Sequence, residues 1–217
     1  MTGLTANVTE AAGKTEAKID GLPDSPTILV VTPEITYLPK GMGNMAQRMH
    51  AKAGGMADVS ASLVSALYDQ GADVHVALPN YRRMFNLDVQ EVHKREYQRV
   101  RENLGKERIH LAEDRVFYHR AEVYADENLR MALAFQRDVI NYIIPQVRPD
   151  LIHCNDWMTG LIPAAARRFN IPSLLTLHNI HTEKLTMAEI EDRGIDAAEF
   201  WNHMYFENPP HSYEESR

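Results

Sequence analysis

The sequence predicts an α/β fold in which a mostly parallel, Rossmann-like sheet carries helices on both faces. Two observations support this prediction. Four short apolar segments have the length and composition of buried strands, namely residues 27–32, 73–79, 151–155 and 173–178. Helical patterns lie between these segments, at the spacing of successive βαβ units. Parallel strands need such helical crossovers, and the crossover helices then cover the sheet.

The first βα unit joins strand 27–32 to a helix that is expected from Met56 to Gln70. Its apolar residues are predicted to form one stripe facing the core: Met56, Val59, Leu63, Val64 and Leu67. Gly71 is well placed as the helix C-cap. The loop between Glu34 and Lys52 is long, and it is open whether this loop is a lid, an acceptor-binding loop or a disordered excursion.

The second unit starts with strand 73–79 and continues into a less regular stretch. Residues 89–92 and 115–118 look like short strands around a charged middle. A long helix is then predicted from Asp126 to Val147, because its apolar residues recur at helical spacing. Pro145 is expected to kink or end this helix.

The last two predicted strands, 151–155 and 173–178, are both expected to lie in the core. Between them, Thr159 is predicted to N-cap a helix that runs to about Phe169, with Pro163 in its first turn. Residues 181–217 show no closing element. The expected organisation is therefore a flexible tail at 1–26 and one Rossmann-like domain at 27–217 that is itself truncated.

Composition narrows the class of protein. Of the 217 residues, 44% are hydrophobic and 24% are charged, which is ordinary for a globular protein. A formal net charge of −7 disfavours a general nucleic-acid-binding surface, because such a surface needs clustered Lys and Arg. The single cysteine, Cys154, excludes an internal disulfide framework. Neither a signal peptide nor a membrane-spanning run is recognisable, so we expect a cytoplasmic location and no membrane contact.

A candidate phosphate site lies at the start of the first helix, in Lys52-Ala53-Gly54-Gly55. Gly54 and Gly55 allow backbone N–H groups to approach an anion closely, and the helix N-terminus adds partial positive charge. The Lys52 ammonium adds a full positive charge. The alternative is a plain glycine-rich turn with a solvated lysine, because short glycine motifs recur by chance.

Further polar groups follow the predicted strands at their carboxyl ends, where open α/β sheets bind ligands. They are Glu34, Asn80-Tyr81-Arg82-Arg83, Asn155-Asp156-Trp157 and His178-Asn179. Each has a structural alternative. The alternative for Asp156 is a cap of the following turn, and the alternative for His178 is a core histidine bonded to the backbone. Glu34 is expected to be a solvated loop carboxylate. Residues 81–83 are expected in an exposed loop, and His178 and His181 lack an evident third metal ligand, so no metal site is expected.

Three motifs in this order resemble the amino-terminal domain of bacterial glycogen synthases and plant starch synthases, the retaining glucosyltransferases with the GT-B fold. Residues 52–59 match the K-x-G-G-L-A-D-V signature, and Pro149 to Leu161 match the segment around D-W-H-T-G-L. Residues 175–179 match T-(I/V)-H-N. Three departures stand out. Met158 replaces the histidine of D-W-H, which would remove a polar contact at the rim. The loop between Glu34 and Lys52 is longer than in typical members, and the second GT-B domain is absent.

The resemblance implies roles for individual residues. Lys52 would contact the phosphates of a nucleotide-sugar donor, with Gly54 and Gly55 closing on them. Asp156 and His178 would be the catalytic-site residues beside the transferred glucose. Glu34 and Asn179 are expected to bind substrate with them.

The resemblance also implies an activity. The chain would belong to an enzyme that transfers glucose from ADP-glucose or UDP-glucose to the non-reducing end of an α-1,4-glucan with retention. The nucleotide sugar is then a substrate, and no cofactor is expected. A C-terminal GT-B domain would be the partner, and the chain alone is expected to be inactive.

Two other functions were weighed against this one. The first is a non-catalytic glucan- or nucleotide-binding module with the same fold. The second, a nicotinamide-dependent oxidoreductase, is disfavoured because Gly41-Met42-Gly43 lies well past the first strand and opens no clear helix.

Overall fold

The computed structural model describes residues 23, 25–101, 107–181, 183–198 and 200. Nearly all of the predicted 1–26 tail and most of the last predicted stretch lie outside the described residues. The described part contains one five-stranded sheet in the order β3-β2-β1-β4-β5. Its strands are β1 (Thr27–Val31), β2 (Asp73–Pro79), β3 (Ile109–Ala112), β4 (Leu151–Asn155) and β5 (Ser173–Thr176).

All neighbouring strands are parallel, which confirms the predicted Rossmann-like fold class. Because β1 lies between β2 and β4, the order of the strands reverses there. Such a switch point opens a crevice at the carboxyl ends of the strands.

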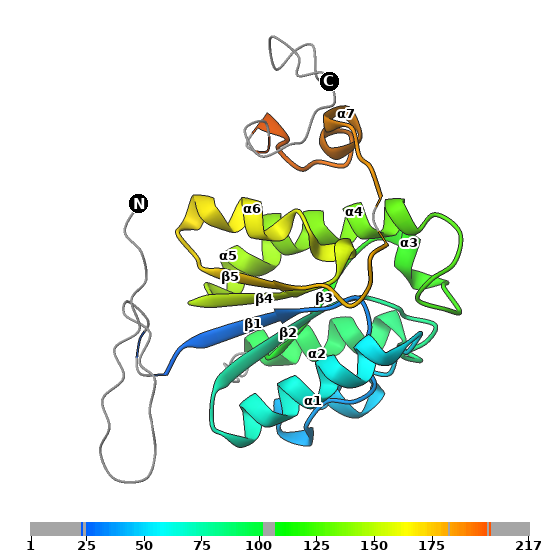
Figure 1. Cartoon of the computed structure of the whole chain (residues 1–217). Coiled ribbons are helices and arrows are strands. Elements are labelled where there is room, and N and C mark those ends of the chain that lie inside the picture. The colour runs from blue at the N-terminus through cyan, green and yellow to red at the C-terminus, as the bar shows by residue number, and fades with distance from the viewer. Residues whose placement is uncertain (1–22, 24, 102–106, 182, 199, 201–217) are drawn as a thin grey trace.

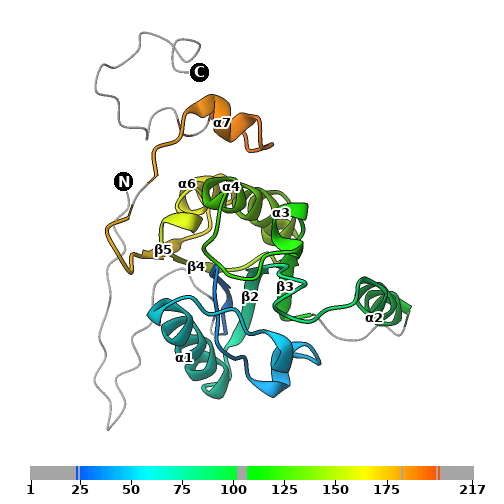
Figure 2. The same ribbon diagram turned by 90° about the vertical axis from the view of Figure 1, so that its right-hand side faces the viewer.

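Helices cover both faces of the sheet, as predicted (Figure 1). On one face lies α1 (Gly55–Asp69), and on the other lie α3 (Arg115–Tyr118), α4 (Asn128–Asp138), α5 (Ile144–Val147) and α6 (Ile162–Ala166). Figure 2 shows that α2 (Val89–Arg101) stands beside the β3 edge rather than over a face of the sheet. A last helix, α7 (Met187–Glu191), packs beyond α4 and α6.

The burial of the strands follows their position in the sheet. Strands β1, β2 and β4 are buried from their second residue onward. Strand β5 is an edge strand, and it was wrongly predicted as a core strand: Leu174 is 57% exposed and Leu177, just beyond it, 66%. An apolar edge strand and a core strand look alike in sequence, because composition does not report how many neighbours a strand has.

The first βα unit matches its prediction within one residue, but the buried stripe of α1 differs. Met56 and Val64 are buried, together with the small residues Ala57, Ser60 and Ala61. Val59 is 52% exposed. Leu67 is partly buried against the core, so the predicted stripe is confirmed at Met56, Val64 and Leu67 and wrong at Val59. The small side chains complete the buried face.

Gly71 ends α1 as predicted. It has φ +82°. The N–H of Gly71 donates to the Tyr68 carbonyl at 2.9 Å and the N–H of Ala72 to the Leu67 carbonyl at 3.0 Å. These two bonds are those of a Schellman motif, in which glycine avoids the steric cost of the left-handed conformation.

We expect Gly71→Ala to lower the free energy of unfolding by about 1–2 kcal/mol, because a Cβ is disfavoured at positive φ. Gly55→Ala is the matched control, since a Cβ at Gly55 meets nothing within 4 Å. That variant should be neutral or slightly stabilising. Urea denaturation measures both, and equal midpoints for the two variants would contradict the argument.

The region after β2 was predicted wrongly. Residues 89–92 begin α2 and residues 115–118 form α3, so neither is a strand. The reason is local capping: the side chain of Asp88 accepts from the N–H of Gln90, and that of Asp114 from the N–H of Val116. The real strand, β3, lies in the charged middle, where His110 interrupts its apolar pattern and bonds His75 at 2.9 Å.

The predicted helix 126–147 is confirmed as one helical path with a wider turn inside it. Helix α4 begins at Asn128, a π-helical turn spans Val139–Ile143, and α5 ends at Val147. Pro145 is therefore the second residue after the π turn. The wider turn relieves the clash between a proline ring and the carbonyl four residues earlier, and the helix continues until Arg148, which has φ 53°.

The predicted N-cap at Thr159 is wrong, although Pro163 does lie in the first turn of α6. Thr159 ends a short 3₁₀ turn, and its hydroxyl donates to the carbonyl of Asp156 at 2.9 Å. The N–H of Leu161, which precedes α6, donates instead to the side chain of Gln136 at 2.7 Å. Gln136 belongs to α4, so no local pattern reveals this contact.

The long loop after β1 is a packed part of the domain. Ile35 and Ala51 form an antiparallel bridge that joins its ends, and 3₁₀ turns occur at Lys40–Met42 and Ala46–Arg48. Its apolar residues are buried in the core: Ile35, Leu38, Met42, Met45, Ala46 and Met49. Of the three predicted alternatives, the disordered excursion is therefore wrong.

Candidate active site

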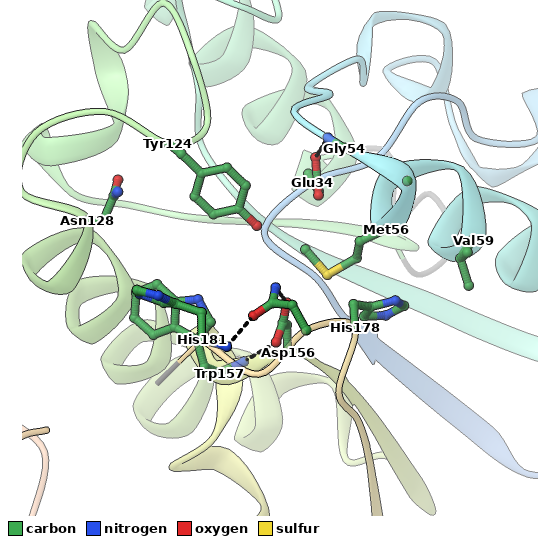
Figure 3. Close-up of a pocket in the computed structure, with 12 residues that line it drawn as sticks. Glu34, Gly54, Met56, Val59, Tyr124, Asn128, Asp156, Trp157, His178 and His181 are labelled. Atoms are coloured by element: carbon green, nitrogen blue, oxygen red, sulfur yellow. Dashed lines mark hydrogen bonds between the residues drawn. The ribbon is translucent and has the colours of Figure 1, made fainter. Parts of the chain in front are cut away.

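A cavity of about 590 Å³ opens at the carboxyl edge of the sheet. Its volume lies in the usual range for small-molecule sites. Its lining comes from the segments that follow β1, β4 and β5, from the start of α1 and from the chain before α4 (Figure 3): Glu34, Gly54, Gly55, Met56, Val59, Tyr124, Asn128, Asp156, Trp157, His178, Asn179 and His181. The fold thus brings six predicted site residues together, namely Glu34, Gly54, Gly55, Asp156, His178 and Asn179.

Glu34 is buried, with 1% exposure, so its prediction as a solvated carboxylate is wrong. Its Oε2 accepts hydrogen bonds from the N–H of Ala53 at 2.5 Å and the N–H of Gly54 at 3.0 Å. The glycine loop is therefore tied to the end of β1 by a carboxylate. The N–H of Gly54, which was predicted to face a phosphate, is therefore already bonded to Glu34.

Lys52 does not line the cavity. Its Nζ lies 2.7 Å from Oδ2 of Asp58, and both side chains are about half exposed. The hydrogen bond from Lys52 lowers the pKa of the Asp58 carboxyl. The two glycines of the motif reach the cavity wall, whereas the ammonium lies along the outside of α1.

Asp156 occupies a backbone conformation that side chains rarely adopt, with φ 64° and ψ 178°. Its N–H donates to the Thr176 carbonyl at 2.8 Å, and Thr159 bonds its carbonyl through both N–H and hydroxyl. These contacts hold a conformation that costs about 1–3 kcal/mol and that clusters at active sites. This backbone conformation directs the Asp156 side chain to the cavity floor, where the residue is 1% exposed.

The Asp156 carboxylate is held at both oxygens. Oδ1 accepts from the N–H of Trp157 at 2.9 Å, and Oδ2 accepts from Nδ2 of Asn179 at 2.7 Å (Figure 3). The first bond confirms the capping alternative for Asp156. The second bond shows that the Asp156 side chain does more than cap the turn. It also links the segments that follow β4 and β5 at the cavity.

His178 and His181 enter the cavity from the segment after β5. Nε2 of His178 lies 3.0 Å from Oδ1 of Asn155. His181 packs edge-to-face on Trp157 and lies 3.2 Å from Glu183. In the described part of the chain, no three His, Cys, Asp or Glu residues are grouped so that they can hold a metal ion.

Tyr124 is a cavity residue that the sequence analysis missed. Its hydroxyl points into the cavity, between Glu34 and Asp156 (Figure 3). Burial raises the pKa of Tyr124, and the charges of Glu34 and Asp156 raise it further. The phenol is therefore protonated at neutral pH and is a hydrogen-bond donor. No signal marks Tyr124 in the sequence, because it does not come directly after a predicted strand.

The loop that carries Tyr124 is fixed by Asn128 at the start of α4. Oδ1 of Asn128 accepts from Nη2 of Arg120 at 2.6 Å and from the N–H of Ala125 at 2.9 Å. Arg120 also donates to the carbonyls of Val123 and Asp126. The tyrosine is thus placed by bonds on both sides of it in the chain.

Other predicted polar residues lie away from the cavity. Tyr81 is fully buried, not in an exposed loop, and its hydroxyl donates to the Pro33 carbonyl at 2.9 Å. Arg82 pairs with Glu113 at 3.0 Å and stacks over Tyr118. Met158, which replaces the family histidine, is fully buried in the core.

His153, on β4 below the site, gives a pH prediction. Burial lowers the pKa of His153, and nearby His178 lowers it further. The unfolded chain then binds more protons than the folded one, so stability is lost as pH falls from about 6.5 towards the folded pKa. We expect His153→Gln to reduce the loss of melting temperature between about pH 7.5 and pH 5.

The exposed His93, changed to Gln, is the control and should melt like wild type at both pH values. Differential scanning calorimetry measures the effect. An unchanged pH dependence in His153→Gln would contradict the prediction.

A parallel sheet with this strand order and a polar cavity at its switch point defines a ligand-binding domain of the Rossmann-like class. Residues 27–212 match the family model described as the starch synthase catalytic domain, and the chain belongs to this family.

Curated relatives agree with the family. The chain is 30% identical over 178 residues to glycogen synthase 2 of Geobacter sulfurreducens and 32% identical over 181 residues to glycogen synthase 2 of Geobacter metallireducens. Each match covers 69% of this chain but 37% of the relative. Glycogen synthase of Desulfitobacterium hafniense is 28% identical over 165 residues, which are 65% of this chain and 35% of that protein. The chain thus spans a little over a third of the length of these relatives.

Among the described residues, no helix combines the length and the apolar composition needed to cross a membrane.

Proposed function

We propose that this chain forms the glucose-binding side of a glucosyltransferase site. In the context of a longer protein, the site would transfer glucose from ADP-glucose or UDP-glucose to the non-reducing end of an α-1,4-glucan, with retention. One observation carries the proposal: Glu34, Asp156 and His178 come from three distant segments and meet at one cavity. The curated relatives named glycogen synthase support the choice of substrates.

The cavity suits a sugar better than a phosphate. Asp156 and Glu34 offer carboxylate oxygens to hydroxyl donors, and Tyr124 offers a donor to a hydroxyl oxygen. Held in place before the substrate arrives, such groups orient the glucose and stabilise charge that develops during transfer. The nucleotide sugar is the substrate here, and the proposal includes no cofactor and no metal.

The diphosphate would lie near the start of α1, where Gly55 lines the cavity and the helix dipole favours an anion. Lys52 would have to leave Asp58 to reach it. An exposed ion pair such as this one is weak and exchanges readily for a stronger anion. The rest of the nucleotide would be held by a C-terminal GT-B domain, which fits the part of the relatives that this chain does not match.

The test is a pair of measurements on the 217-residue chain. Saturation-transfer NMR with ADP-glucose, UDP-glucose and maltotetraose should detect binding of a nucleotide sugar, and Asp156→Ala should abolish it. Incubation with radiolabelled donor and glycogen should give no transfer, because this chain would supply only one side of the donor site.

Each other outcome has a definite meaning. Binding of maltotetraose alone would favour the alternative, a non-catalytic glucan-binding module. Absence of binding to all three ligands would overturn the proposal. Glucosyl transfer by the chain alone would show that it is not half of a site.

A further inference from the structure

Asn155, the last residue of β4, lies directly behind the cavity. It is 1% exposed and does not line the cavity. Its partner in the neighbouring strand is Thr176, two residues before His178. This register brings the amide of Asn155 against the imidazole of His178.

The orientation of this amide is determined by its other neighbour. Nδ2 of Asn155 donates to the carbonyl of Val31 on β1 at 3.3 Å. A backbone carbonyl is only an acceptor, so the amide nitrogen must face β1 and the amide oxygen must face His178. A flipped amide would place two oxygens against each other at the β1 side.

The amide orientation in turn determines where the imidazole carries its hydrogen. Oδ1 of Asn155 lies 3.0 Å from Nε2 of His178, and this oxygen is only able to accept. Nε2 of His178 must therefore be the N–H nitrogen. In the neutral ring, Nδ1 then carries the lone pair, and no described residue forms a hydrogen bond with Nδ1.

We propose that Asn155 is a positioning residue that holds His178 in the Nε2–H tautomer, so that Nδ1 is an acceptor for the ligand. The ligand group at this wall is then a hydrogen-bond donor, such as a sugar hydroxyl, and not a phosphate oxygen. The nature of that group rests on the proposed function, whereas the tautomer does not.

The tautomer is tested on the 217-residue chain labelled with ¹⁵N-histidine. Long-range ¹H–¹⁵N correlation at about pH 8.5, where imidazoles are neutral, distinguishes the N–H nitrogen of each ring from the bare one. His178→Gln identifies the signals of His178 by removing them. Wild type should show His178 with the hydrogen on Nε2 and a bare Nδ1.

Three substitutions separate positioning from general disturbance. Asn155→Leu removes the acceptor and should shift His178 to a mixture of tautomers or to the Nδ1–H form. Asn155→Asp loses the donor to the Val31 carbonyl, as Asn155→Leu does, but retains an acceptor towards His178 and should keep the Nε2–H form. Asn141→Leu, which changes an exposed asparagine that bonds Gly194, should leave the His178 signals unchanged. Wild-type His178 in the Nδ1–H form, or unaltered signals in a folded Asn155→Leu variant, would overturn the proposal.

Ligand binding provides a second readout. Asn155→Leu should weaken binding of the nucleotide sugar by about 10-fold, the effect of one lost hydrogen bond. Asn155→Asp should bind more tightly than Asn155→Leu, which a merely structural role would not produce. If no sugar ligand binds even to wild type, the proposed function fails while the tautomer result stands on its own.

Discussion

Asp156→Ala is expected to weaken nucleotide-sugar binding by about 100-fold or more, because the proposed site would lose the buried carboxylate that accepts charge-assisted hydrogen bonds from sugar hydroxyls. The buried carboxylate faces the cavity directly and also orients the amide of Asn179 through a 2.7 Å bond. Removing it leaves the cavity floor without a charge and frees the segment after β5. Titration calorimetry with ADP-glucose and UDP-glucose measures the loss.

Asp156→Gly separates the carboxylate from the backbone strain. Glycine adopts φ 64° and ψ 178° without the steric cost that alanine carries. The glycine variant should therefore be more stable than the alanine variant, by about 1–3 kcal/mol. It should bind ligand as poorly as alanine, and wild-type affinity in Asp156→Gly would show that the carboxylate has no role in binding.

Glu34→Ala is expected to lower the free energy of unfolding by about 3 kcal/mol. Two backbone N–H groups, of Ala53 and Gly54, lose their charged acceptor, and each such bond contributes about 1.5–3 kcal/mol. The loss is less than the full sum because these amides lie near the surface and regain water. Urea denaturation measures stability, and hydrogen exchange at Ala53 and Gly54 should accelerate.

Glu34→Gln is the matched control, because a single amide oxygen is able to accept both hydrogen bonds that Oε2 now accepts. Its loss of stability should be less than half that of Glu34→Ala. Equal losses in the two variants would show that burial of the side chain, and not its bonds to the glycine loop, accounts for the effect.

Much of the fold was predictable because its strongest signals are local. Residues 73–79 and 151–155 form strands within the predicted bounds, and α1 deviates by one residue at each end. Strands buried on both faces are mostly apolar, and α1 ends in a glycine with the expected left-handed conformation. Where side-chain capping competed with an apolar pattern, as at Asp88 and Asp114, the apolar pattern predicted a strand but the chain forms a helix.

The candidate site also contains both residues that the sequence predicted and residues that it did not. Asp156 and His178 follow strands, so the rule for parallel sheets located them at one edge. Tyr124 does not come directly after a strand and reaches the cavity through a loop held by Asn128, so this rule did not locate it. Lys52 has the right place in its motif, yet its side chain lies against Asp58.

The sequence by itself determined the class of fold, the family and the edge of the sheet at which the polar groups collect. Apolar periodicity and short motifs each involve residues that are close together in the chain, so they can be recognised without a structure. Only the tertiary structure decided what those groups bond: Glu34 with the glycine loop, Asp156 with Asn179, and Asn155 with both Val31 and His178. The physical reason is distance along the chain, because contacts between residues 20 to 124 positions apart depend on strand order and register.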